Sequence, residues 1–73
     1  MSRIAAIGEP DRVGVFAFAG VHVTAAADEP AARAAWRALP SDTSLVILTP
    51  MAEAAVGAER GDREDLLCAV MAP

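Results

Sequence analysis

One apolar segment, SLVILTP at residues 44–50, limits the fold of this chain more than any other feature. Its centre, residues 45–48, is a run of large apolar side chains with no polar residue between them. A strand with one face in water alternates apolar and polar residues, whereas a strand covered on both faces does not. The segment therefore predicts a strand with cover on both faces, which is typical of parallel α/β domains.

Shorter patterns on either side of this strand alternate between strand and helix. Three further segments have the composition of short strands: residues 3–7, 21–24 and 66–71. Three prolines stand where the first turn of a helix is expected: Pro10, Pro30 and Pro50. The first helix is expected to end at Gly20, its C-cap glycine. Val13, Phe16 and Ala17 should share one face of it. Glu9 or Asp11 should lie beside the free N–H groups at its start.

The second and third helices have clear start signals. Asp28, Glu29 and Pro30 mark the start of the second helix, with a carboxylate as its N-cap. Ala32, Trp36 and Leu39 form its apolar stripe, and Pro40 stops it. Thr49 and Pro50 mark the start of the third helix, which continues to about Ala58 and frays into a charged loop within residues 57–65. The whole pattern predicts one α/β domain over residues 1–73: a small three-layer domain with a four-stranded parallel sheet and Rossmann-like or receiver-like topology.

Composition excludes several classes of function. The net charge is −4, and all six basic residues are arginine, which argues against a nucleic-acid surface and against anionic lipid. No apolar run is long enough to span a membrane, and no signal peptide is apparent. Cys68 is the single cysteine, which suits a reducing compartment, so a cytoplasmic protein is expected. The high apolar content of so short a chain leaves a partner-covered surface and self-association open.

The layout around Gly8 resembles the start of a nucleotide-binding fold, but the chemistry does not follow. A dinucleotide fingerprint needs three glycines in the first strand–helix turn, and only Gly8 is present, beside Glu9 and Asp11. Gly8 is therefore interpreted as a turn residue. A receiver-type phosphoacceptor would need an aspartate after the third strand and a lysine, but Thr49 stands there and lysine is absent.

No catalytic, cofactor-binding or metal-binding residue is expected. His22 is the single histidine and lies on the polar side of an alternating strand, so a solvated position is favoured. Ser41, Thr43 and Ser44 are interpreted as turn residues. Trp36 is the one large aromatic that could anchor an interface, although its place in the apolar stripe favours the core. Trp36, Arg33 and Arg37 are the candidate partner-contact residues.

Several of these segments together resemble the small F subunit of the archaeal and bacterial V-type (A-type) ATPases. Ile7, Gly8 and Glu9 resemble the Ile-Gly-acid end of that family's first strand, and FAFAGV at residues 16–21 resembles its Gly-Phe-x-Leu-Ala-Gly-Val signature. DEPAARAAWRAL, SLVILTPMAEAAV and LLCAVMAP are similar to its second helix, third strand with following helix, and last strand. The chain looks like a short form without the family's C-terminal helical segment.

The resemblance implies a non-catalytic subunit without a cofactor. The F subunit belongs to the central stalk, binds the coiled-coil shaft subunit, rotates inside the catalytic ring and helps couple ATP hydrolysis or synthesis to proton or ion transport. A protein of this kind would reach the membrane only through its complex. Two alternatives stay open: a stand-alone adaptor or self-associating α/β module that has left the ATPase, and a small-ligand or phospho-signalling domain of receiver type.

Overall fold

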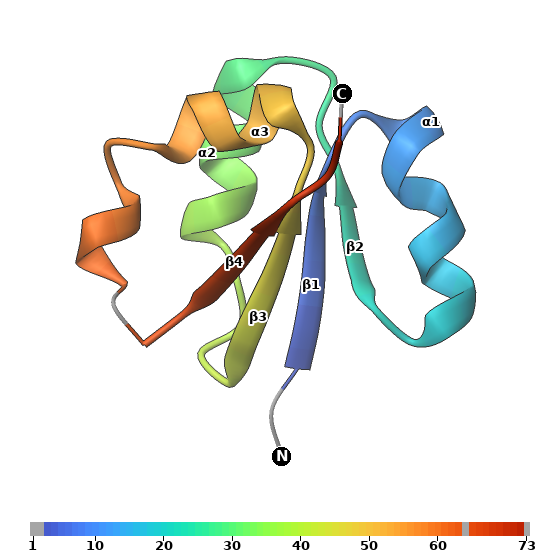
Figure 1. The fold of residues 1–73 in the computed structure, drawn as a ribbon, viewed down its shortest axis with the longest axis horizontal. Coiled ribbons are helices and arrows are strands. Elements are labelled where there is room, and N and C mark those ends of the chain that lie inside the picture. The colour runs from blue at the N-terminus through green and yellow to red at the C-terminus, as the bar shows by residue number, and fades with distance from the viewer. Residues whose placement is uncertain (1–2, 64, 73) are drawn as a thin grey trace.

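Four parallel strands form the middle layer of the fold (Figure 1). The computed structural model of the chain describes residues 3–63 and 65–72; Met1, Ser2, Glu64 and Pro73 lie outside it. The strands are β1 (Arg3–Gly8), β2 (His22–Ala25), β3 (Thr43–Leu48) and β4 (Leu67–Val70), in the spatial order β2-β1-β3-β4. Every neighbouring pair is parallel, so the expected four-stranded parallel sheet is confirmed.

Helices lie on both faces of this sheet. They are α1 (Pro10–Val13), the 3-10 helix η1 (Gly14–Ala19), α2 (Glu29–Arg37), α3 (Pro50–Val56) and the 3-10 helix η2 (Arg60–Asp62). The connection from β1 to β2 runs one way along the sheet, and those from β2 to β3 and from β3 to β4 run the other way. Because crossovers are right-handed, α1 with η1 lies on one face, and α2 with α3 lies on the other.

The main core lies between the sheet and the pair α2 and α3. Ala5 and Ile7 of β1 and Val46 and Leu48 of β3 point into it and are fully buried. The helices contribute small alanines and the side chain of Trp36, which is only 4% exposed. The predicted core position of Trp36 in the apolar stripe is therefore confirmed. Alanine lets helix and sheet approach closely, so one large aromatic can fill much of the space between them.

The opposite face of the sheet is only half covered. There α1 and η1 contact β1 and β2 but leave β3 and β4 uncovered. The strand register places apolar residues in two rows, Ile4–Leu45–Leu67 and Ala6–Ile47–Ala69. Five of these six are partly or largely exposed and are called the open face from here on: Ile4, Leu45, Ile47, Leu67 and Ala69. The expectation that β3 is covered on both faces is wrong for this side, because the one helix on it lies over β1 and β2.

Local signals set the helix starts correctly, but two of the expected ends lie too far along the chain: α2 ends at Arg37, before Pro40, and α3 ends at Val56, before Ala58. Asp28 accepts a hydrogen bond from the Ala31 amide at 3.0 Å, and Gly20 ends η1 in the left-handed region with φ of 75°. The expected first helix, however, is α-helical for only four residues and continues as 3-10 helix. Glycine, β-branched and aromatic residues from Val13 to Phe16 have low helix propensity, which explains the tightening. The predicted strand at residues 21–24 is shifted by one residue, to His22–Ala25.

Candidate functional site

The order of the strands defines where a ligand site would be expected. In open parallel sheets, ligands bind beyond the carboxyl ends of the strands, where the direction of the connections reverses. In this sheet that point lies between β1 and β3. Gly8 ends β1, Glu9 follows it, and Thr49 follows β3. These three residues therefore occupy the position at which a related fold would hold a phosphate or a nucleotide.

Gly8 packs directly against Thr49. A Cβ atom built on Gly8 would lie 2.2 Å from Cγ2 and 2.5 Å from Oγ1 of Thr49, which is fully buried. Among the residues that the structure describes, the only glycine with positive φ is Gly20. The interpretation of Gly8 as a turn residue is therefore wrong. Its lack of a side chain is needed for close approach between the ends of two strands, and the Thr49 side chain occupies the space so created.

Thr49 joins the start of α3 to the start of α1. Its Oγ1 accepts a hydrogen bond from the Ala52 amide at 3.4 Å, which caps α3, and donates one to Oε1 of Glu9 at 2.6 Å. Glu9 occupies the N-cap position of α1 and Asp11 its first turn, as expected for acids near the free amides of that helix, although the Glu9 side chain makes no cap hydrogen bond. The Thr49 bond, followed by the backbone N–H of Glu9, lowers the pKa of the Glu9 carboxyl below its ordinary value of 4.5.

The end of the described chain lies across the same edge of the sheet. The Met71 amide donates to the Leu48 carbonyl at 2.8 Å, and the Arg12 guanidinium donates to the Ala72 carbonyl. Figure 1 shows the C-terminal end beside α1, above the carboxyl ends of β1 and β3. The bonds at this edge therefore tie the chain to itself, and its acidic group, Glu9, would repel a phosphate.

The Glu9–Thr49 bond predicts a specific pH dependence of stability. Because folding lowers the pKa of Glu9, its stabilisation is fully present above the unfolded value and is lost as the pH falls through the folded value. In thermal unfolding from pH 7 to pH 3, Glu9→Gln and Thr49→Val are each expected to flatten this acid loss. Thr49→Ser, which keeps the hydroxyl, should retain the wild-type slope. An unchanged slope in Glu9→Gln would remove the bond as its cause.

The three candidate partner-contact residues lie on α2 with different exposures. Trp36 is buried, whereas Arg37 is exposed and Arg33 half-buried. Arg33 lies 3.7 Å from Glu29, as the spacing of the two residues predicts, and Arg37 donates to Glu59 at 2.8 Å. Trp36, Arg37, Glu59 and Arg63 line a cavity of about 210 Å³. Any contact that a partner makes on this face would involve the arginines, with only the edge of the indole reachable.

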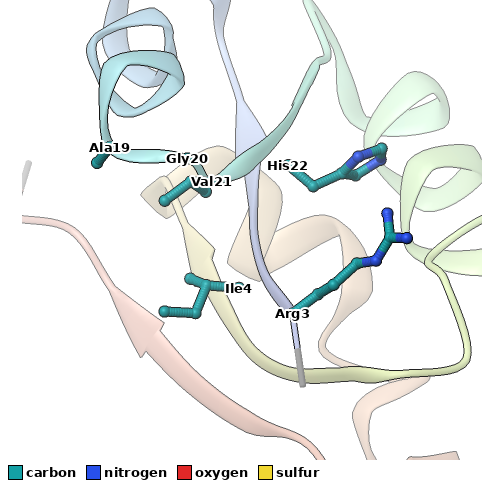
Figure 2. A pocket seen from close by; sticks show the side chains of 6 residues that line it. All are labelled: Arg3, Ile4, Ala19, Gly20, Val21 and His22. Carbon is teal, nitrogen blue, oxygen red and sulfur yellow. The ribbon is translucent and has the colours of Figure 1, made fainter. Parts of the chain in front are cut away.

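A larger hollow lies at the opposite end of the sheet from the switch point (Figure 2). It measures about 490 Å³ and is lined by Arg3, Ile4, Ala19, Gly20, Val21 and His22. Arg3 and His22 extend to one side of the sheet, and Ile4 and Val21 to the other. Arg3 is paired with Asp42 at 3.1 Å, and His22 is exposed, as its place on the strand predicted. The hollow therefore lies across the end of the sheet, and its polar side chains do not converge on one point where a ligand could be bound.

Neither a metal-ligand cluster nor a membrane-spanning helix is found among the described residues. Residues 3–63 and 65–72 hold no group of three or more histidine, cysteine, aspartate or glutamate side chains that could hold a metal ion. In the same residues no helix combines the length and the apolar character needed to cross a bilayer.

The open face is the surface feature that the sequence did not reveal. Its members are ordinary strand residues, and nothing in their pattern distinguishes them from the covered residues of the same strands. Only the order β2-β1-β3-β4 shows that a single helical segment lies on this face and that it lies at the β2 side. One signal could have predicted it. The segments LVIL and LLCAV have apolar residues on both faces, and a single helical segment is too small to cover one face of both strands.

Comparison with known proteins does not identify the chain. No protein-family model matches it, and no curated protein or solved structure matches it significantly.

Proposed function

We propose that the chain is a non-catalytic docking subunit and, more specifically, a cytoplasmic central-stalk subunit of a rotary V-type ATPase. In this role it would contact the coiled-coil shaft subunit inside the catalytic ring and help couple ATP hydrolysis or synthesis to ion transport. The specific role is supported by the motifs at residues 7–9 and 16–21 that resemble the F subunit, which here lie at the end of β1 and over η1 and its C-cap.

The observation that carries the docking role is the open face. Ile4 is 43% exposed and Leu67 is 72% exposed, and Leu45 lies between them in the same row of the sheet. Exposed apolar residues that are contiguous in this way mark interaction surfaces more often than scattered ones do. A rod-shaped partner with an apolar stripe, such as one helix of a coiled coil, would pack along β3 and β4 as α1 packs along β1 and β2.

The residues at the carboxyl ends of β1 and β3, where a ligand site would be expected, also support the docking role. At the switch point Thr49 fills the space above Gly8, and the Glu9 carboxylate is bonded to Thr49. A nucleophile would need an adjacent base, and a phosphate site would need free backbone amides or a basic side chain. The one basic group there, Arg12, is bonded to the Ala72 carbonyl. The proposal therefore assigns no catalytic residue, and Arg33 and Arg37 stay candidates for an additional partner contact.

The docking role is tested by a charge placed on the open face. Ile4→Lys should weaken binding to the coiled-coil shaft subunit of the same source by at least about 10-fold, because a lysine ammonium would be desolvated against apolar side chains. Val15→Lys is the matched control: Val15 is 66% exposed on η1 and is not one of the five residues of the open face. Both variants should fold, since both side chains already reach solvent. Co-purification and titration calorimetry measure the effect.

The outcomes separate the stalk role from docking in general. If the wild-type chain has no measurable affinity for any shaft subunit of its source, the stalk role is abandoned. If it binds but Ile4→Lys binds equally well, the open face is not the contact. The alternative is a stand-alone adaptor or self-associating module, and self-association would use a different feature, the edge of β4.

A further inference from the structure

The outer edge of β4 has no partner strand in the part of the chain that the structure describes. In the sheet order β2-β1-β3-β4, β4 has a neighbour on one side only. Its four residues, Leu67 to Val70, include no charge and no proline, and both Leu67 and Val70 are largely exposed. Edge strands normally carry such protective residues because their free N–H and C=O groups pair readily with another strand. The edge of β4 lacks that protection.

The ladder to β3 shows which backbone groups face outward. The Met71 amide donates to the Leu48 carbonyl, so the peptide groups of Met71 point toward β3. Because successive residues of a strand turn their peptide groups to opposite sides, Leu67 and Ala69 also face β3, and Cys68 and Val70 face outward. The outer edge therefore offers two N–H donors and two C=O acceptors, all from Cys68 and Val70.

These four groups match a second copy of the same strand. An antiparallel pair related by a two-fold axis at Ala69 places Cys68 opposite Val70 of the other copy, and both such pairs exchange two hydrogen bonds. Every outward donor and acceptor is then used. Leu67 faces Met71 of the other copy on the open-face side, so that apolar groups meet at each position.

The charged groups lie at the two ends of this pairing. Arg12 is bonded to the Ala72 carbonyl, and the pairing brings Ala72 opposite Leu66 of the other copy. Asp65, next to Leu66, is 67% exposed and lies 3.4 Å from Arg63. Each end of the paired strands therefore brings the Arg63–Asp65 ion pair of one copy near the Arg12 guanidinium of the other. The strand between the two ends is uncharged, so no charge on β4 itself opposes the contact.

We propose that the chain forms a symmetric homodimer in which two β4 strands pair antiparallel about Ala69 and join two sheets into one. This proposal does not depend on the stalk role, because the pairing uses the outward backbone groups of Cys68 and Val70, which do not belong to the open face. It can hold for a stalk subunit or for a stand-alone module, and its test needs only the purified chain.

Cysteine cross-linking tests the register. In a Cys68→Ala background, Ala69→Cys places two thiols in a non-hydrogen-bonded pair with Cα atoms about 4.5 Å apart, which suits a disulfide. Ala25→Cys in the same background is the matched control, since Ala25 is an exposed alanine at the other edge, in β2. Mild oxidation should give a covalent dimer from Ala69→Cys at least about 10-fold faster than from Ala25→Cys. Equal rates would overturn the pairing.

Sedimentation equilibrium tests the dimer without cross-linking. The wild-type chain should sediment at twice its 7.5 kDa, and Val70→Pro should raise the dimer dissociation constant at least about 10-fold. Proline removes an outward donor, and a strand edge tolerates it. The control is Ala25→Pro. The amide of Ala25 points outward at the β2 edge, because the next amide, of Ala26, points inward and donates to the Gly8 carbonyl. A wild-type monomer at all soluble concentrations, or a dimer unaffected by Val70→Pro, would overturn the proposal.

Discussion

Trp36→Ala is expected to lower the free energy of unfolding by about 3–5 kcal/mol, because it removes a large aromatic from a closely packed core. Trp36 is 4% exposed and is the largest side chain between the sheet and the pair α2 and α3. Its neighbours on α2 and α3 are mostly alanines, which cannot expand to fill the cavity. A chain of 73 residues has a total stability of about 4–11 kcal/mol, so the variant would lose much of it.

The effect should appear in urea unfolding followed by far-UV circular dichroism, since the variant has no tryptophan left to report by fluorescence. The melting temperature should fall by at least about 12 °C. Arg33→Ala is the control on the same helix. It removes the half-exposed ion pair with Glu29 and is expected to lower the free energy of unfolding by less than about 0.5 kcal/mol. A loss below about 1 kcal/mol for Trp36→Ala would mean that Trp36 is free to serve a partner and does not hold the core.

Gly8→Ala should cost about 1–3 kcal/mol, although it adds a single methyl group. That methyl would lie 2.2 Å from Cγ2 of Thr49, far inside van der Waals contact, and Thr49 is fully buried with its hydroxyl bonded to Glu9. Relief requires either that β1 and β3 separate at their carboxyl ends or that Thr49 leaves its rotamer. Either movement also weakens the cap of α3.

Two further variants isolate the clash. Gly14→Ala is the matched control, because a Cβ atom there meets nothing within 4 Å and its φ of −57° is helical; it is expected to be neutral or to stabilise by up to about 1 kcal/mol. In a Thr49→Gly background the contacting side chain is absent, so Gly8→Ala should cost less than about 0.5 kcal/mol. An equal cost of Gly8→Ala in both backgrounds would show that the contact with Thr49 is not its cause. Urea unfolding measures all of these proteins.

The contrast between Gly8 and Asp28 shows which features a sequence can predict. Asp28 caps α2 through an amide three residues away, so its neighbours in the chain were sufficient to predict the bond. Gly8 has its role through Thr49, which is far from it in the chain, and nothing near Gly8 distinguishes a turn glycine from one that admits a distant side chain. The pairing of Glu9 with Thr49 was missed for the same reason.

The open face and the β4 edge show a second limit. The apolar character of Ile4, Leu45 and Leu67 is evident in the sequence, but their alignment in one row depends on strand order and register. Burial of Trp36 was predictable because a helical stripe repeats every three or four residues and needs no knowledge of its partner. Exposure of Leu67 was not predictable, because it depends on which strands α1 and η1 cover.

The amino-acid sequence by itself determined the four strands, the positions at which α1, α2 and α3 begin, and the parallel α/β class. These features depend on residues within a few positions of one another, where propensity, periodicity and capping act. The tertiary structure alone decided that Gly8 admits Thr49 and, within residues 3–63 and 65–72, that half of one sheet face lacks a covering helix and that β4 is an edge strand. Those features arise from contacts between segments far apart in the chain, which local patterns do not encode.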